Sequence, residues 1–300
     1  MPIPIADALA VQEGAAMAKV AQARRTPGRY FLSSMLAGAY VGVAVVLLLL
    51  VSAPFLAARS PSTKLVQGAV FGVALTLVVF AGAELFTGNV MVMVQALASR
   101  TIRATDAAVV LVGSLVGNLV GSIAFGALVA GSGVIGTGGS RAAPNPFMNA
   151  LDGIVSTKAA LPGGQLFFRA VLCNLLVCLA LWMAARTTSD AAKLVCLWWA
   201  LLAFVASGFE HSVANMTLFA VAVFVHAPHA AWDTLGRNLA WTVPGNLVGG
   251  GVLVGAVYAW LGREPAPARE AAVTGGIDAG AVVELEPVTL DTVEPAGQPA

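Results

Sequence analysis

The five residues GNLVG at positions 117–121 recur unchanged at positions 245–249, a displacement of 128 residues (245 − 117). A second pattern, Gly-x-Glu-x4-Asn, begins at Gly82 and again at Gly208, a displacement of 126 residues (208 − 82). Two matches in the same order at nearly the same displacement indicate that the chain contains two diverged copies of one unit. Internal repeats in an apolar chain are typical of channels and transporters, whose functional site lies where the copies meet.

The composition is that of a membrane protein. Hydrophobic residues make up 58% of the 300 residues and charged residues only 10%, whereas a soluble domain carries about a quarter charged residues. The net charge is only +1, which argues against a basic surface that could bind nucleic acid. The three cysteines lie in apolar stretches and, like the three histidines, lack metal-ligand spacing, so we expect no metal site and no cofactor.

Charge-free runs predict six membrane spans, since about 20 apolar residues cross the hydrocarbon core. Two further apolar pieces, residues 89–99 and 212–225, are too short to span, and each follows a Gly-x-Glu motif. We therefore expect the second span of each half to be broken by an irregular loop, at residues 84–88 and 208–212. Unwound backbone at membrane depth is tolerated where it lines a cavity, so the breaks are the candidate pore. The six runs are residues 30–58, 65–83, 107–131, 170–185 (extended by 166–169), 194–209 and 238–262.

Three spans per half is an odd number, so the second copy must enter the membrane from the opposite side. The chain is thus predicted to be an all-α membrane protein with six transmembrane helices in an inverted 3+3 repeat. Ten Lys and Arg residues fall on the side of the chain ends and six on the other, which favours cytoplasmic termini. The predicted parts are an N-terminal cytoplasmic amphipathic segment (1–28), a channel domain (29–262, with repeats of about 29–139 and 164–262) and a disordered acidic tail (263–300).

Glu84 and Glu210 are the two acidic residues within the predicted spans, and both lie in the breaks. A carboxyl group at membrane depth is costly and points to function. We favour a scaffold role, in which each Glu accepts hydrogen bonds and holds its break open, over direct contact with substrate. Asn89 and Asn215, which end the same motif, are assigned to this scaffold.

His211 is the sole histidine within the spans, and its proton can move near neutral pH. Thr87 and Ser212 are placed to cap the restarted half-helices, whose N-termini would offer free N–H groups to an anion. Lys158 and Asn174 are candidate further donors, although Lys158 fits an ordinary loop lysine equally well. Apolar side chains around these groups would exclude hydrated ions or else face lipid or core: Phe71, Leu75, Leu85, Phe86, Val177 and Phe204.

The motifs AGAELFTG (81–88), GNLVG (117–121), ASGFEHSVANM (206–216) and PGN (244–246) resemble those of the formate–nitrite transporter family across residues 28–261. The resemblance implies an aquaporin-like protomer, a homopentamer with one pore per subunit, and passage of small monovalent anions. It implies a polar midpoint formed by His211 and Thr87, with Lys158 in a vestibule and Asn174 on the fourth span. It also implies two apolar slits, a cytoplasmic one of Leu75, Leu85, Phe86 and Val177 and a periplasmic one of Phe71 and Phe204.

Residues 172–184 and 215–220 look like the nitrite branch of the family more than the formate branch. The sequence therefore predicts a nitrite channel or transporter of the bacterial inner membrane, with formate or hydrosulfide as alternative substrates. His211 would either deliver a proton that makes neutral nitrous acid or remain a neutral hydrogen-bond donor.

Two other classes compete with this interpretation. A neutral-solute facilitator of the aquaporin type carries paired Asn-Pro-Ala signatures, and the sequence has none. An intramembrane enzyme built on Glu210 and His211 would need a nucleophile or a metal cluster, and the sequence offers neither. We therefore expect that the chain is not an enzyme.

Overall fold

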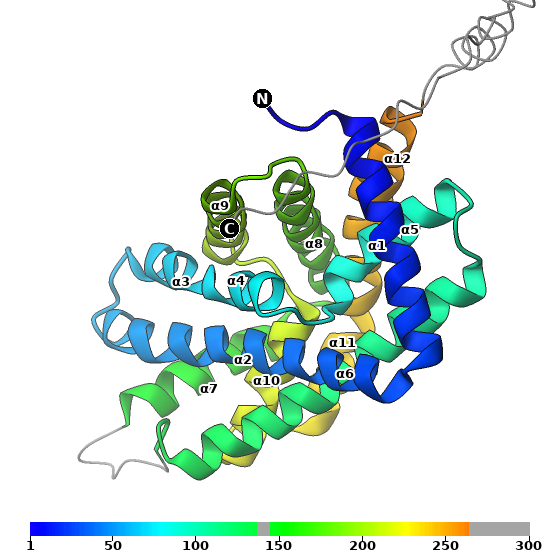
Figure 1. Cartoon of the computed structure of the whole chain (residues 1–300). Helices are drawn as coiled ribbons and strands as arrows, with labels where there is room; N and C mark the ends of the chain where they lie inside the picture. The colour runs from blue at the N-terminus through cyan, green and yellow to red at the C-terminus, as the bar shows by residue number, and fades with distance from the viewer. Residues whose placement is uncertain (137–144, 264–300) are drawn as a thin grey trace, which may run out of the picture. The chain divides into compact units, whose positions relative to one another are not determined.

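The computed structural model describes residues 1–136 and 145–263, in which every regular element is a helix (Figure 1). The tail predicted to be disordered, residues 263–300, lies outside the described residues except for Arg263. In chain order the helices are α1 (Ile5–Arg25), α2 (Pro27–Ala57), α3 (Thr63–Phe71), α4 (Val73–Phe80), α5 (Phe86–Ala98), α6 (Ala104–Ser132), α7 (Pro146–Ala160), α8 (Gly163–Ala185), α9 (Asp190–Ala206), α10 (Ser212–Phe224), α11 (Trp232–Leu247), the π-helix η1 (Val248–Ala256) and α12 (Val257–Leu261).

Five helical segments are long and apolar enough to cross a membrane: α2, α3 with α4, α6, α8, and α11 through α12. They correspond to five of the six predicted runs, and the all-helical membrane fold is confirmed. The sixth run is α9, which has 17 residues and is slightly shorter than the about 20 that a span needs. The two short apolar pieces are the half-helices α5 and α10.

Helix α7 precedes α8 and contributes a wall of the site described below. Its first turn is fixed by Asn145, whose side-chain oxygen accepts from the N–H groups of Phe147 (2.9 Å) and Met148 (3.2 Å). Pro146 occupies the first helical position, where its missing N–H costs nothing. The local sequence thus starts a helix that ends close to Lys158.

The repeated GNLVG motif is where helices cross at the closest range. A Cβ atom added at Gly121 of α6 would collide with the Met35 carbonyl of α2, and one added at Gly249 of η1 would collide with the Val171 carbonyl of α8. Only glycine leaves room for a neighbouring backbone at these two points. The motif therefore sets the approach of the third span to the first in both halves, and its asparagine is carried to the break.

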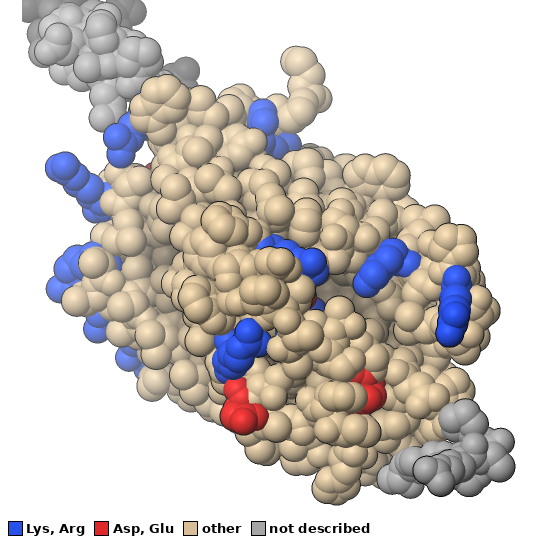
Figure 2. Space-filling view, turned by 180° about the vertical axis from the view of Figure 1, so that it is seen from behind, with Lys and Arg blue, Asp and Glu red and all other residues tan. Residues whose placement is uncertain are grey.

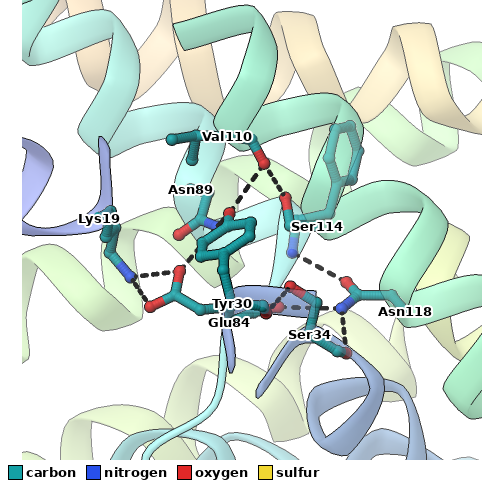
Figure 3. Close-up of polar contacts among 9 residues, drawn as sticks. Lys19, Tyr30, Ser34, Glu84, Asn89, Val110, Ser114 and Asn118 are labelled. Carbon is teal, nitrogen blue, oxygen red and sulfur yellow. Dashed lines mark hydrogen bonds and ion pairs between the residues drawn. The ribbon is translucent and has the colours of Figure 1, made fainter. Parts of the chain in front are cut away.

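In the first half that asparagine is Asn118, and it joins three chain segments (Figure 3). Its Nδ2 donates to the carbonyls of Ser34 (2.7 Å) and Glu84 (2.9 Å), while its Oδ1 accepts from the Phe86 N–H (2.9 Å). Asn118 is fully buried, so these bonds satisfy backbone groups that water cannot reach.

Asn246 repeats the arrangement in the second half. Its Nδ2 donates to the carbonyls of Ala170 (2.8 Å) and Glu210 (3.2 Å), and its Oδ1 accepts from the Ser212 N–H (3.0 Å). The two breaks are therefore built by one bonding scheme, as expected for two copies of one unit.

The breaks lie slightly earlier than the sequence predicted. They cover residues 81–85 and 207–211, so Thr87 is already in the first turn of α5. The expected caps are wrong. Leu85 and His211 hold the N-cap positions, because α5 begins at Phe86 and α10 at Ser212. Asn118 and Asn246, from other helices, bind the first N–H of each half-helix.

We expect Asn118→Leu and Asn246→Leu each to lower the melting temperature by about 5–10 °C, because a buried backbone group left unpaired costs about 1–3 kcal/mol. Thermal unfolding of the purified protein in detergent measures the change. Ser114→Ala is the matched control, since Ser114 is also fully buried on α6 but its hydroxyl donates to Val110 of its own helix. Equal losses in all three variants would contradict the role given to the asparagines.

Candidate functional site

The two breaks bring Thr87 and His211 together although they lie 124 residues apart in sequence. Thr87 Oγ1 lies 3.1 Å from His211 Nε2, and both side chains are buried. The contact joins the first turn of α5 to the end of the second break. It is the point at which polar side chains from both halves meet.

His211 itself caps α10, a role that the sequence analysis gave to Ser212. The Ala214 N–H donates to His211 Nδ1 at 3.1 Å. Because a backbone N–H can only donate, Nδ1 has no proton, and the proton of the neutral ring is on Nε2, which donates to Thr87 Oγ1. The ring stacks on Phe204 with centroids 5.9 Å apart and planes at 22°, which fixes its orientation.

Asn174 of α8 binds the backbone of Thr87 at the same point. Its Nδ2 donates to the Thr87 carbonyl at 3.1 Å and to the Asn246 carbonyl at 2.7 Å. Asn174 therefore binds the backbone of α5 to that of α11. The structure places it in the scaffold beside the midpoint.

Each motif glutamate forms an ion pair with a lysine and a hydrogen bond with the asparagine of its own motif. In the second half Glu210 Oε1 lies 2.7 Å from Lys158 Nζ, and Glu210 Oε2 accepts from Asn215 Nδ2 at 2.7 Å. Both oxygens of a carboxylate that is almost fully buried are thus occupied. This bonding fits the predicted scaffold role.

The first half has the same arrangement with a partner that sequence reasoning missed (Figure 3). Glu84 Oε1 lies 2.7 Å from Lys19 Nζ, and Glu84 Oε2 accepts from Asn89 Nδ2 at 3.0 Å. Lys19 belongs to α1, which lies against α2, α5 and α6. The available signal was positional, since α1 and α7 each precede the first span of a half and each carries a lysine.

A second contact holds α1 to α6, and another holds α7 to a loop. Arg24 Nε donates to Asp106 at 2.6 Å. On α7, Asp152 Oδ2 lies 2.9 Å from His229 Nδ1, although the sequence analysis gave these two residues no role. Both lysine-bearing helices are therefore fastened at two points.

A cavity of about 700 Å³, here called the vestibule, opens between α2, α3, α7, α8, α9 and α10. His211 and Phe204 lie in its wall with Phe71. Lys and Arg side chains gather at and around a hollow on one face of the molecule (Figure 2). The charged side chains of the vestibule wall are Lys64, Lys158, Arg169 and Glu210.

Beyond the vestibule lies a second cavity of about 10 Å³, here called the inner cavity, with room for about one water molecule. Phe71, Phe204 and His211 line both cavities, and the two phenyl rings meet edge to face with centroids 5.6 Å apart. These two rings form the wall between the cavities. The other residues around the inner cavity are Val41, Ala74, Leu75, Leu85, Val177 and Leu201.

Five of the six residues predicted for apolar slits thus border the inner cavity. The sixth, Phe86, is buried but does not line it. Because the break ends at residue 85, Phe86 is the first residue of α5, and its N–H binds Asn118. The hydrogen bond from the Phe86 N–H to Asn118 gives Phe86 a structural role at the start of α5.

The chain matches known proteins over nearly all of its described length. The sequence profile of the family described as Formate/nitrite transporter covers residues 9–260. The chain is 42% identical over 249 residues to the nitrite transporter NirC of Salmonella typhimurium, which covers 81% of this chain and 88% of the relative. It is 36% identical over 248 residues to a probable formate transporter of Methanothermobacter thermautotrophicus, covering 77% and 88%.

Two solved structures share the fold. One is described as an FNT family ion channel, with a TM-score of 0.78, 37% identity, and coverage of 86% of this chain and 99% of that one. The other is described as a pentameric formate channel with formate bound, with a TM-score of 0.68, 28% identity, and coverage of 80% and 98%.

The cap bond predicts which nitrogen of His211 carries the proton. We expect ¹⁵N spectra of histidine-labelled protein in lipid at pH 7.5 to show Nε2 protonated and Nδ1 bare, because Nδ1 accepts from Ala214. The His211→Asn variant identifies the signal by its loss. A protonated Nδ1 at this residue would contradict the arrangement.

Proposed function

The chain belongs to the formate/nitrite transporter family, and we propose that it is a membrane channel or transporter that carries nitrite through its own fold. The matched relatives are named as transporters and channels, not enzymes. Nitrite is favoured over formate because the relatives named as nitrite transporters are 41–42% identical to the chain, against 36% for the probable formate transporter. The observation that carries the proposal is a basic vestibule whose wall contains the aromatic pair Phe71 and Phe204 together with His211, the partner of Thr87.

The vestibule favours anions by charge. Three basic side chains and one acidic side chain line it, so its wall carries a net charge of +2 (3 − 1) with His211 neutral. A cavity with one sign of charge and low-dielectric walls raises the local concentration of the opposite ion. A small monovalent anion such as nitrite is therefore enriched before it meets the aromatic wall.

The wall and the inner cavity select against ions that keep their water. The inner cavity accommodates about one water molecule, so an anion must shed its hydration shell between Phe71 and Phe204 at a cost of several kcal/mol. His211 lines both cavities beside these two rings and is the donor at this point. The first N–H groups of the half-helices, which the sequence analysis offered to the anion, bind Asn118, Asn246 and His211 instead.

Assembly and orientation follow from the family. We propose a homopentamer with one pore per subunit, because a solved structure similar to this chain is described as pentameric. The inverted 3+3 arrangement is supported by the matching bonds of Asn118 and Asn246. The excess of Lys and Arg on the side of the chain ends supports cytoplasmic termini in the inner membrane of a bacterium.

Anion uptake into liposomes tests the function directly. We expect the purified protein to carry nitrite faster than formate, lactate or hydrosulfide, and faster than protein-free liposomes carry it. A larger flux of formate than of nitrite would identify formate as the substrate. This alternative is supported by the similar structure described as having formate bound. Absence of flux for all four anions would refute the proposal.

The variant His211→Asn distinguishes between two roles of His211, a neutral hydrogen-bond donor and a proton relay. Asparagine is among the best N-caps and keeps donors, but it cannot titrate. We expect nitrite flux within about tenfold of the parent and with the same pH dependence, because one altered hydrogen bond costs about 1 kcal/mol. Loss of the pH dependence would instead assign the proton relay to His211, with release of its cap bond to Ala214.

We expect Phe204→Ala to raise chloride leak by more than about tenfold. This corresponds to lowering the free-energy barrier for chloride at the aromatic wall by more than about 1.4 kcal/mol. The substitution opens the wall between the vestibule and the inner cavity. Phe209→Ala is the matched control, since Phe209 lines the vestibule but not the inner cavity. Chloride flux in both variants at the parent's level would show that Phe204 does not close the pore.

A further inference from the structure

The vestibule contains a basic side chain that forms no ion pair. Lys158 is bound to Glu210 at 2.7 Å, and Arg169 donates weakly to the Gly208 carbonyl at 3.5 Å. Lys64 is exposed and lines the same cavity, yet no carboxylate lies within ion-pair distance of it in residues 1–136 and 145–263. Among the described residues, Lys64 and Arg169 are thus the vestibule cations without an ion pair, and Lys64 is the exposed one of the two.

Lys64 also begins a row of vestibule residues along one face of α3. Gln67 and Phe71 follow it by three and seven residues, which is the spacing of one helix face. All three line the vestibule. Gln67 is buried and held by a bond from its Nε2 to Ser52 Oγ at 3.1 Å, and Phe71 belongs to the aromatic wall.

Lys64 lines the same cavity as Lys158, Glu210 and Arg169, close enough for their charges to act on it. Because Lys158 and Glu210 neutralise each other at short range, the uncompensated charges that an incoming anion meets are those of Lys64 and Arg169. Lys64 therefore offers an anion a full positive charge, whereas the charge of Lys158 is offset by Glu210. Lys158 cannot move away from Glu210 without leaving a buried carboxylate without its counter-ion, which is costly.

We propose that Lys64 is the first anion-binding group of the vestibule, which receives nitrite and directs it along α3 to the Phe71–Phe204 wall. This inference rests on the proposed function. Lys158 then belongs to the scaffold of the second break, and Lys64 determines how well the pore is loaded at low substrate concentration.

The test is the concentration dependence of nitrite flux into liposomes. We expect Lys64→Gln to raise the half-saturating nitrite concentration about threefold to tenfold, with a smaller change in maximal flux, because a loading group acts before the barrier. The variant should also lose part of the parent's sensitivity to salt. Arg59→Gln is the matched control, since it removes the same charge five residues away and Arg59 does not line the vestibule.

A charge-reversal experiment provides a second measurement in a single variant. Lys64→Cys is treated with a methanethiosulfonate that adds either an ammonium or a sulfonate group, with the treated parent as control for Cys196, the partly exposed native cysteine. We expect the ammonium to restore loading and the sulfonate to weaken it further.

The outcomes separate the two proposals. If the parent carries no nitrite, the proposed function fails and the inference about Lys64 fails with it. If the parent carries nitrite but Lys64→Gln keeps the parent's half-saturating concentration, or both reagents act alike, the role of Lys64 alone is overturned. A shift shared equally by Arg59→Gln would also overturn it, because general surface charge would then explain the effect.

Discussion

A backbone that leaves the helix at membrane depth must find all its hydrogen-bond partners inside the protein, because lipid offers none. In this chain Asn118 and Asn246 supply them, each with two donated bonds and one accepted bond at its break. The glycines of the same motif allow the neighbouring helix to come close enough for those bonds. The half-helices, the polar midpoint and both cavities depend on these two side chains.

The breaks also explain the distribution of charge. Each carries a carboxylate where an isolated ion is expensive, and each carboxylate is matched by a lysine from the helix that precedes the half, Lys19 or Lys158. The pairing leaves both breaks close to neutral. The net positive charge of the vestibule then comes from side chains outside the breaks, and attraction of the anion is separated from the stability of the fold.

Hydropathy and internal repetition were enough to predict five spans and to locate the breaks within about three residues, because both depend on local composition. The contact of Thr87 with His211 agrees with the midpoint implied by the family resemblance. The partner of Glu84 was missed, since the ion pair joins residues 65 positions apart through the packing of α1, and its one signal in the sequence was the corresponding position of Lys19 and Lys158 ahead of each half. The caps were wrong because α5 begins at Phe86 and α10 at Ser212, so that Thr87 and Ser212 lie inside the half-helices.

Leu85 and His211 occupy corresponding positions in the two copies, 126 residues apart (211 − 85), and both are N-cap residues. A cap position is ordinarily restricted to small polar side chains. In both copies an asparagine from another helix binds the first N–H of the half-helix, whichever residue holds the N-cap. One copy acquired an apolar residue that lines the inner cavity, and the other acquired an imidazole. Two breaks that share one bonding scheme thus place chemically different side chains, one apolar and one polar, in the wall of the same inner cavity.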